Sequence, residues 1–367
     1  MTKVVVRSAA CLALLLSALQ AAHADSVSSV VYVRADSDRT VVVSPRAHLE
    51  HELDARSRLD LSYAADIWTS ASVDVRAMAT VPVTEQRDEL DLSLSHEWQD
   101  VLLSASYRYS VENDYVSHGA SLNGQLDLAQ NNTTIAVTVF GFSDKVGRSG
   151  DASFSRNLRT LGARGTLTQI LDERSLVQLT YEFGILEGYQ ASPYRFVGIG
   201  GSGFGCEGTQ VCLPEHLPSS RRRHALALLA RRALGERVSV GANYRFYFDD
   251  WQLRSHTLSA ELSWMPTDQA ELLLNYRVYL QTGVYFYSPV YPSYLGRSGY
   301  TTRDREQSPM RDHRLGVEWI QTLWMDSASA RLRLHTSLGG VLFKYENFRG
   351  LDSVRALELT LALSLVR

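Results

Sequence analysis

Apolar and polar residues alternate at every second position along most of the chain after residue 24. In residues 41–53, apolar residues fill most odd positions, whereas charged residues, histidine and serine fill most even ones. Residues 238–249 and 270–281 repeat the pattern, with leucine and aromatic residues on the apolar side. Successive side chains of a β-strand point to opposite faces. A period of two residues therefore predicts strands with one apolar and one polar face.

About sixteen such segments follow one another without a linker rich in proline or serine. They start near residues 27, 40, 58, 87, 101, 117, 133, 157, 175, 221, 237, 254, 270, 311, 330 and 354. Residues 221–232 are rich in alanine and leucine, which suits a helix equally well. Their place between two clear strands favours a strand there as well.

The connections between the segments differ in length in a regular way. Short turns lie at residues 53–56, 98–100, 129–132, 171–174, 234–237 and 265–268, and mostly longer connections between them lie at residues 69–85, 144–156, 187–220 and 282–311. Short turns on one side and long loops on the other are typical of an outer-membrane barrel, with periplasmic turns and extracellular loops. A secreted β-sandwich also has alternating strands, but it has no reason to sort its connections in this way.

Aromatic residues follow the same two ends. Trp98 and Trp264 end strands at short turns, whereas Tyr107, Tyr181 and Phe246 lie near the ends of strands that run toward the long loops. Tryptophan and tyrosine rings favour the headgroup level of a membrane, where the ring is buried and its polar tip stays hydrated. The pattern predicts two aromatic girdles.

Backbone chemistry requires that such strands close into a cylinder. An unpaired N–H or C=O group in hydrocarbon costs on the order of several kcal/mol, so no open sheet edge is tolerated there. We therefore predict an all-β fold, a transmembrane antiparallel up-and-down β-barrel of about sixteen strands. Its apolar faces meet lipid, and its charged residues line the lumen, paired across the wall rather than catalytic. The predicted lumen-lining residues are Arg46, Glu50, Arg58, Asp60, Asp91, Glu97, Arg108, Glu182, Arg245, Glu261 and Arg277.

Composition narrows the class and the compartment. With 45% hydrophobic and 21% charged residues and a net charge of -3, the chain is not of a disordered, collagen-like or disulfide-dense class. Beyond residue 24 no run of about 18 apolar residues predicts a spanning helix. Residues 1–24 have basic Lys3 and Arg7, a short apolar stretch and an Ala-His-Ala site, which predicts a cleaved signal peptide. Residues 25–367 then form one barrel domain in the outer membrane of a Gram-negative cell, with no basic patch for nucleic acid.

Two cysteines remain after removal of such a signal. Cys206 and Cys212 have five residues between them in a segment rich in glycine and proline. In an exported protein this spacing favours a disulfide that closes a small loop, and two thiols alone make a poor structural zinc site. Two free thiols or a metal site are the alternatives.

Signatures of catalysis are sparse. The chain has no Gly-x-Ser-x-Gly elbow, His-Glu-x-x-His helix or phosphate-binding glycine loop. His118 near Asp114 and His256 near Asp250 are the candidates for a histidine and acid pair at the rim, although a structural role is the more frequent one. The acidic pairs at residues 112 and 114 and at residues 249 and 250 lack the spacing of a calcium loop. We therefore predict no catalytic residue, no metal and no cofactor.

Residues 282–311 form an unusually aromatic connection. It contains six tyrosines and phenylalanines, namely Tyr285, Phe286, Tyr287, Tyr291, Tyr294 and Tyr300. Such a loop suits a stacking surface for sugars or other flat ligands. A rigid loop whose rings pack on one another and on the barrel rim is the favoured interpretation.

Several short strings resemble a known family. They lie at residues 38–45, 70–75, 112–115, 192–197 and 249–251, the last followed by His256 and Thr257. In this order they resemble a family of bacterial outer-membrane barrels known only as a domain of unknown function, number three-five-seven-zero. The resemblance covers nearly the whole chain after residue 24. It implies a fold and a location, and it carries no activity or catalytic residues with it.

The leading functional hypothesis is a porin-like channel, or a conduit or docking shell for an exported product, without chemistry of its own. Outer-membrane lipid and the outer-membrane insertion machinery are its expected partners, and a periplasmic protein or an exported polymer is a further candidate. One alternative is an outer-membrane enzyme that acts on lipid or surface polysaccharide. The other is a plugged barrel that serves as a scaffold for a periplasmic complex.

Overall fold

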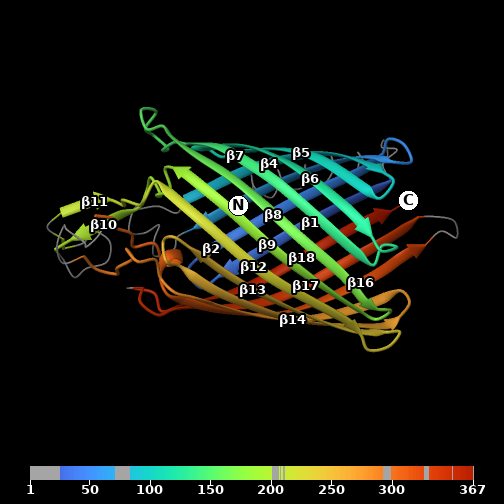
Figure 1. Cartoon of the computed structure of the whole chain (residues 1–367). Coiled ribbons are helices and arrows are strands. Elements are labelled where there is room, and N and C mark those ends of the chain that lie inside the picture. Colours follow the sequence, from blue (N-terminus) through green and yellow to red (C-terminus); the bar gives the residue numbers. More distant parts are fainter. Residues whose placement is uncertain are drawn as a thin grey trace.

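Sixteen long strands close into one antiparallel barrel (Figure 1). The structure, a computed structural model, describes residues 25–70, 83–200, 206, 208–209, 211–291, 299–325, 330–348 and 350–366. Each barrel strand pairs with its neighbour in sequence, and β18 pairs with β1 to close the cylinder. Strand β9 lies beside β12 because β10 and β11 form a separate two-stranded sheet between them in the chain. No helix in the described part of the chain is both long enough and apolar enough to cross a membrane.

The strands confirm the predicted fold class and nearly all of the predicted positions. The barrel strands are β1 (Ser26–Asp36), β2 (Thr40–Glu52), β3 (Ser57–Ser70), β4 (Val83–Trp98), β5 (Val101–Val111), β6 (Tyr115–Leu128), β7 (Thr133–Val146), β8 (Arg156–Asp172), β9 (Ser175–Gly188), β12 (Ser220–Ala233), β13 (Val238–Asp249), β14 (Arg254–Thr267), β15 (Ala270–Gln281), β16 (Met310–Met325), β17 (Arg331–Tyr345) and β18 (Ser353–Val366). The largest difference is at β4, which was expected near residue 87 and begins at Val83. The ambiguous segment at residues 221–232 is a strand, because it is paired on both sides within the closed barrel.

Exposure distinguishes the inner from the outer face of the wall. In β18, Ala356 and Glu358 are 4% and 9% exposed, whereas the alternating Leu357 and Leu361 are 68% and 45% exposed. Side chains on the concave side of a cylinder converge, and those on the convex side diverge. The charged and small residues therefore lie inside, and the leucines lie on the outside, as in a membrane barrel.

The two ends of the barrel differ. Trp98, Trp264 and Trp324 lie exposed near the short turns. At the other end, β10 (Phe196–Ile199) and β11 (Val211–Pro214) stand beyond the barrel strands, at the left in Figure 1. Cys206 and Cys212 form a disulfide in this segment, with their Cα atoms 5.4 Å apart.

Rings of the aromatic connection pack together at the loop end. Val284 and Phe286 form a buried cluster with Trp251 and Leu253 from the turn after β13, and Tyr300 packs against it. Tyr291 joins a second cluster with Val197 and Ile199 of β10. This packing agrees with the interpretation of residues 282–311 as a loop whose rings pack on one another. Pro292 and Tyr294, which belong to the same connection, lie outside the described residues.

Candidate functional site on the inner wall

Alternate residues of each strand face the inside of the barrel, and all of the predicted lumen-lining residues lie at inward-facing positions. Most of them form ion pairs with a residue on another strand. Glu50 pairs with Arg58 at 3.1 Å, Asp91 with Arg108 at 2.9 Å and Glu182 with Arg164 at 2.5 Å. The remaining contacts are Arg46 with Asp66 at 3.9 Å, Asp60 with His48 at 3.7 Å, Glu261 with Arg231 at 3.2 Å, and Arg277 with Asp312 at 2.8 Å. Arg245 places its guanidinium over the ring of Tyr247, and Glu97 lies exposed near the end of β4.

The inner face also holds charged residues that the sequence analysis did not single out. Asp66 on β3 lies between Arg46 on β2 and Arg87 on β4, and it pairs with both. Arg314 on β16 reaches past β17 to Glu358 on β18, with 2.9 Å between Nε and Oε2. These residues occupy inward-facing positions of their strands, as the predicted lumen-lining residues do, so the alternation alone would have identified them. Their partners required the strand register.

Glycines make room for long side chains on this face. A Cβ atom on Gly339 of β17 would lie 3.3 Å from Oε2 of Glu358, so the glycine leaves space for the ion pair that crosses its strand. Phe142 lies over Gly119, and Phe140 lies over Gly162, where an added Cβ would approach each ring to 2.4 Å. The two rings therefore lie close against the wall of the barrel. Aromatic cover of a glycine on a neighbouring strand is a recurrent device in curved sheets.

Two hollows follow this inner wall. One of about 310 Å³ is lined by Asp91, Arg108, Phe140 and Phe142, among others, and extends to Arg164 and Glu182. A second of about 340 Å³ is also lined by Arg164 and Glu182 and continues to Arg245. The ion pair of Arg164 and Glu182 therefore separates two polar recesses. This arrangement offers hydrogen-bond donors and acceptors to a hydrophilic solute in a barrel wide enough to hold water.

The histidines and aspartates of the two candidate pairs each have another partner. Nδ1 of His118 is 2.7 Å from the hydroxyl of Tyr107, while Asp114 accepts a hydrogen bond from Tyr194. Nδ1 of His256 is likewise 2.7 Å from the hydroxyl of Tyr244, and Asp250 accepts from the backbone N–H of Arg222. The reason is strand parity, which turns both histidines to the outer face, whereas both aspartates belong to turns at the rim.

Asp249, a member of one of the acidic pairs, is already held by protein donors. Asp249 accepts hydrogen bonds from Arg221, from the hydroxyl of Tyr247 and from the backbone N–H of Leu253. On the inner face, ligand atoms of His48, Glu50 and Asp60 lie within 4.8 Å of one another. Arg58 already pairs with Glu50 there, and His48 lies 2.9 Å from the hydroxyl of Ser62. Ordinary ion pairing accounts for this group without a metal.

The sequence comparison identifies the family. A family model described as "Protein of unknown function (DUF3570)" matches residues 73–162 and 155–333. The chain belongs to this family. The predicted resemblance is thus confirmed. No curated protein matches the sequence.

Solved structures of outer-membrane barrels are similar in fold to this DUF3570 protein. A structure named "Bacterial polysaccharide outer membrane secretin" matches with a TM-score of 0.53 at 11% identity, over 94% of this chain and 99% of that one. The ferric enterobactin receptor of Pseudomonas aeruginosa matches with a TM-score of 0.46 at 12% identity, over 89% and 55%. The TodX monoaromatic hydrocarbon channel matches with a TM-score of 0.41 at 13% identity, over 93% and 88%. At such identities the likeness to the first structure concerns the fold alone.

A buried carboxylate joins the two long connections of this DUF3570 protein. Oε1 of Glu215 accepts hydrogen bonds from the backbone N–H of Arg303 at 2.8 Å and from the hydroxyl of Thr302 at 3.0 Å. Arg195 lies 3.6 Å from the other carboxylate oxygen and 2.7 Å from Asp304. Burial raises the pKa of Glu215 above its usual range, against the opposing effect of Arg195.

This raised pKa predicts a pH-dependent stability of the loop end. Glu215 holds its proton more tightly in the folded loops than in the unfolded chain. Its contribution to the stability of the loops is therefore fully present below the unfolded pKa of about 4.5, and it is lost as the pH rises through the folded pKa. The melting temperature of the loops, followed by the near-UV circular dichroism of their packed rings, should therefore fall as the pH is raised above 4.5. Glu215→Gln should flatten this slope, and Glu187→Gln, an exposed control, should not. Equal slopes in wild type and Glu215→Gln would show that Glu215 does not couple the loops to pH.

Proposed function

We propose that this protein is a passive conduit for hydrophilic solutes in the outer membrane of a Gram-negative cell, without catalytic chemistry of its own. In this proposal residues 1–24 are a cleaved export signal. The surrounding partners are the membrane lipid and the machinery that inserts barrels. The observation that carries the proposal is the inner wall, where charged residues from β2 to β18 face a concave surface with polar hollows.

The pairing of the charges supports a particular selectivity. Most carboxylates on the inner wall lie within 4.0 Å of an arginine or a histidine, so positive and negative charges compensate locally. A field that cancels over a few ångströms discriminates weakly between cations and anions. Neutral or zwitterionic polar solutes fit such a wall best.

Conductance in planar lipid bilayers tests the proposal. We expect discrete steps with weak ion selectivity from the wild type. Replacement of Arg108 and Arg164 by glutamine leaves Asp91 and Glu182 without their arginine partners, and should shift the selectivity toward cations by about twofold or more. Arg159→Gln, which changes the outer wall, should leave the selectivity unchanged. A silent bilayer at high protein load would exclude an open conduit.

A second candidate is the passage of a saccharide chain. Phe140 and Phe142 lie close against an otherwise polar wall between the ion pairs of Arg108 and Arg164, with their ring planes inclined by 59°, and aromatic rings suit the apolar faces of sugars. The polysaccharide secretin with a similar fold motivates the same idea. Concentration-dependent block of the conductance by linear oligosaccharides, weakened several-fold in Phe140→Ala, would favour this candidate over a general pore. No block in the wild type would remove it.

A further inference from the structure

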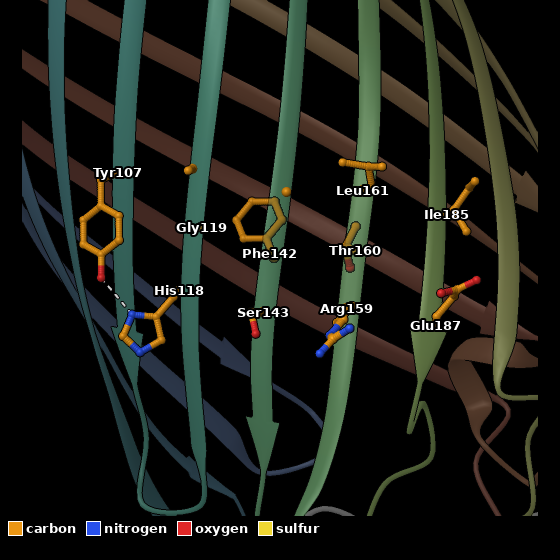
Figure 2. A pocket seen from close by; sticks show the side chains of 12 residues that line it. Tyr107, His118, Gly119, Phe142, Ser143, Arg159, Thr160, Leu161, Ile185 and Glu187 are labelled. Atoms are coloured by element: carbon orange, nitrogen blue, oxygen red, sulfur yellow. Dashed lines mark hydrogen bonds between the residues drawn. The ribbon is translucent and has the colours of Figure 1, made fainter.

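The outer wall carries a repeated pair of tyrosine and histidine near the loop end. In the described part of the chain, a tyrosine hydroxyl lies near Nδ1 of a histidine on the next strand in four places. The pairs are Tyr107 with His118 at 2.7 Å, Tyr181 with His224 at 2.8 Å, Tyr244 with His256 at 2.7 Å and Tyr276 with His313 at 2.8 Å. Figure 2 shows the first of them. In all four places the histidine lies opposite the residue two positions after its tyrosine. The four pairs therefore lie at about the same height along the barrel axis.

Arginine precedes the histidine by two residues in three of these pairs. Arg222, Arg254 and Arg311 share the outer face with His224, His256 and His313, one step closer to the loops. All three arginines are exposed. Tyrosine and histidine have amphipathic rings that suit the membrane interface, and arginine extends its cation toward the headgroups. The level of these residues is therefore that of the lipid phosphates on the loop side.

The strand register brings three cations together on one part of this level. Arg311 on β16 lies directly opposite Lys344 on β17. Arg355 on β18 lies opposite Leu342, diagonally from Lys344. Among the described residues, no acidic group lies within 4.0 Å of these three cations in a salt bridge. The acidic residues of β16 and β18, by contrast, have the other parity and pair on the inner wall.

Like charges directly opposite each other destabilise a sheet unless a counter-ion lies between them. Water cannot fully screen charges at a membrane surface, and lipid phosphates are the anions present at this depth. We propose that the outer wall of β16, β17 and β18 binds the phosphate group of an outer-leaflet lipid, held by Arg311, Lys344 and Arg355 above the pair of Tyr276 and His313. This site depends on the barrel spanning a membrane and not on its being a conduit.

The opposite part of the outer wall provides an internal comparison. Between β5 and β9 lies a hollow of about 550 Å³, lined by Tyr107, His118, Leu161, Ile185 and other residues (Figure 2). Arg159 at its loop end lies opposite Glu187 in the strand register. A carboxylate of the protein is thus already available to this arginine. This region should have little preference for a phosphorylated lipid.

Native mass spectrometry of the full-length protein in neutral detergent tests the site with two probes, diphosphorylated lipid A and its dephosphorylated form. Each cation near a membrane surface strengthens the binding of an anionic lipid by about fivefold. With three cations, the wild type should therefore bind the phosphorylated form roughly 100-fold more tightly than the other. The triple variant Arg311→Gln, Lys344→Gln, Arg355→Gln should lose this preference, whereas Lys145→Gln with Arg159→Gln should keep it. Equal binding of both lipids by the wild type, or equal loss in both variants, would overturn the proposal.

A single substitution keeps the test decisive should the triple variant fail to fold. Without phosphorylated lipid and at low salt, Lys344→Gln removes repulsion from Arg311 and should raise the melting temperature. With diphosphorylated lipid A present, the same variant should gain less thermal stability than the wild type. A lower melting temperature in the absence of lipid would show that Lys344 stabilises the wall by itself and would contradict the proposed site.

Discussion

Replacing Arg221 by alanine is expected to lower the free energy of unfolding by about 3–5 kcal/mol. Arg221 donates from Nε and Nη2 to one oxygen of Asp249 at 2.8 and 2.5 Å, and it lies over the ring of Trp251. The side chain of Asp249 is 0% exposed. Without Arg221 this buried carboxylate loses its ion-pair partner, which costs far more than the loss of a surface ion pair.

Urea unfolding in lipid, followed by tryptophan fluorescence, measures this loss. Arg222→Ala is the matched control, because the neighbouring arginine points outward and is exposed. It should change the free energy by about 0.5 kcal/mol or less in neutral lipid. Arg221→Leu combined with Asp249→Leu should recover much of the loss, since both members of the buried ion pair are then removed together. An Arg221→Ala variant as stable as Arg222→Ala would refute the role given to this pair.

Leu359→Arg is expected to destabilise the barrel by about 2–4 kcal/mol. Leu359 lies near the middle of β18 on the outer face, opposite Val33 on β1 and Leu338 on β17. An arginine there would be exposed to the hydrocarbon core, where its charge finds no partner. The adjacent Thr360→Arg places the same side chain on the inner face beside Tyr32 and Ser337. That variant should cost about 1 kcal/mol or less. Urea titrations of both variants measure the difference, and equal costs would contradict the assignment of faces.

The architecture was readable from the sequence because the two solvents of a membrane barrel act on every strand. Lipid on one side of the wall and water on the other require apolar and polar residues to alternate within each strand. This requirement does not depend on the loops or turns that connect the strands. This is why even residues 221–232, with their helical composition, take the parity of their neighbours as β12. The short turns and the exposed Trp98 and Trp264 near them fit the same scheme.

The contacts within each face were not readable, because they depend on the register between strands. The alternation puts Arg314 and Glu358 on the inner face, but it does not predict the register by which the pair forms across β17, over the space left by Gly339. The histidines show the same limit. His118 and His256 are close in sequence to aspartates, yet parity sends them to the outer wall, where tyrosines two positions off the register contact them.

The packing of the long connections was beyond the sequence for another reason. Glu215 and Thr302 meet although 87 residues separate them, and neither belongs to a repeating pattern. The contact arises from two loops that pack together at one end of the barrel, where no period constrains the chain. Only the general preference of an aromatic loop for packing on its own rings was predictable.

Site-directed spin labelling along β18 tests the central claim most directly. Single cysteines are introduced one at a time between residues 356 and 362 in a Cys206→Ser, Cys212→Ser background, and the protein is reconstituted in lipid. We predict that labels at Leu357, Leu359 and Leu361 collide mainly with oxygen dissolved in the bilayer, and that labels at Ala356, Thr360 and Ala362 collide mainly with a water-soluble nickel complex. Accessibility without this alternation, or with the opposite phase, would contradict a barrel with leucines toward lipid and charges inside.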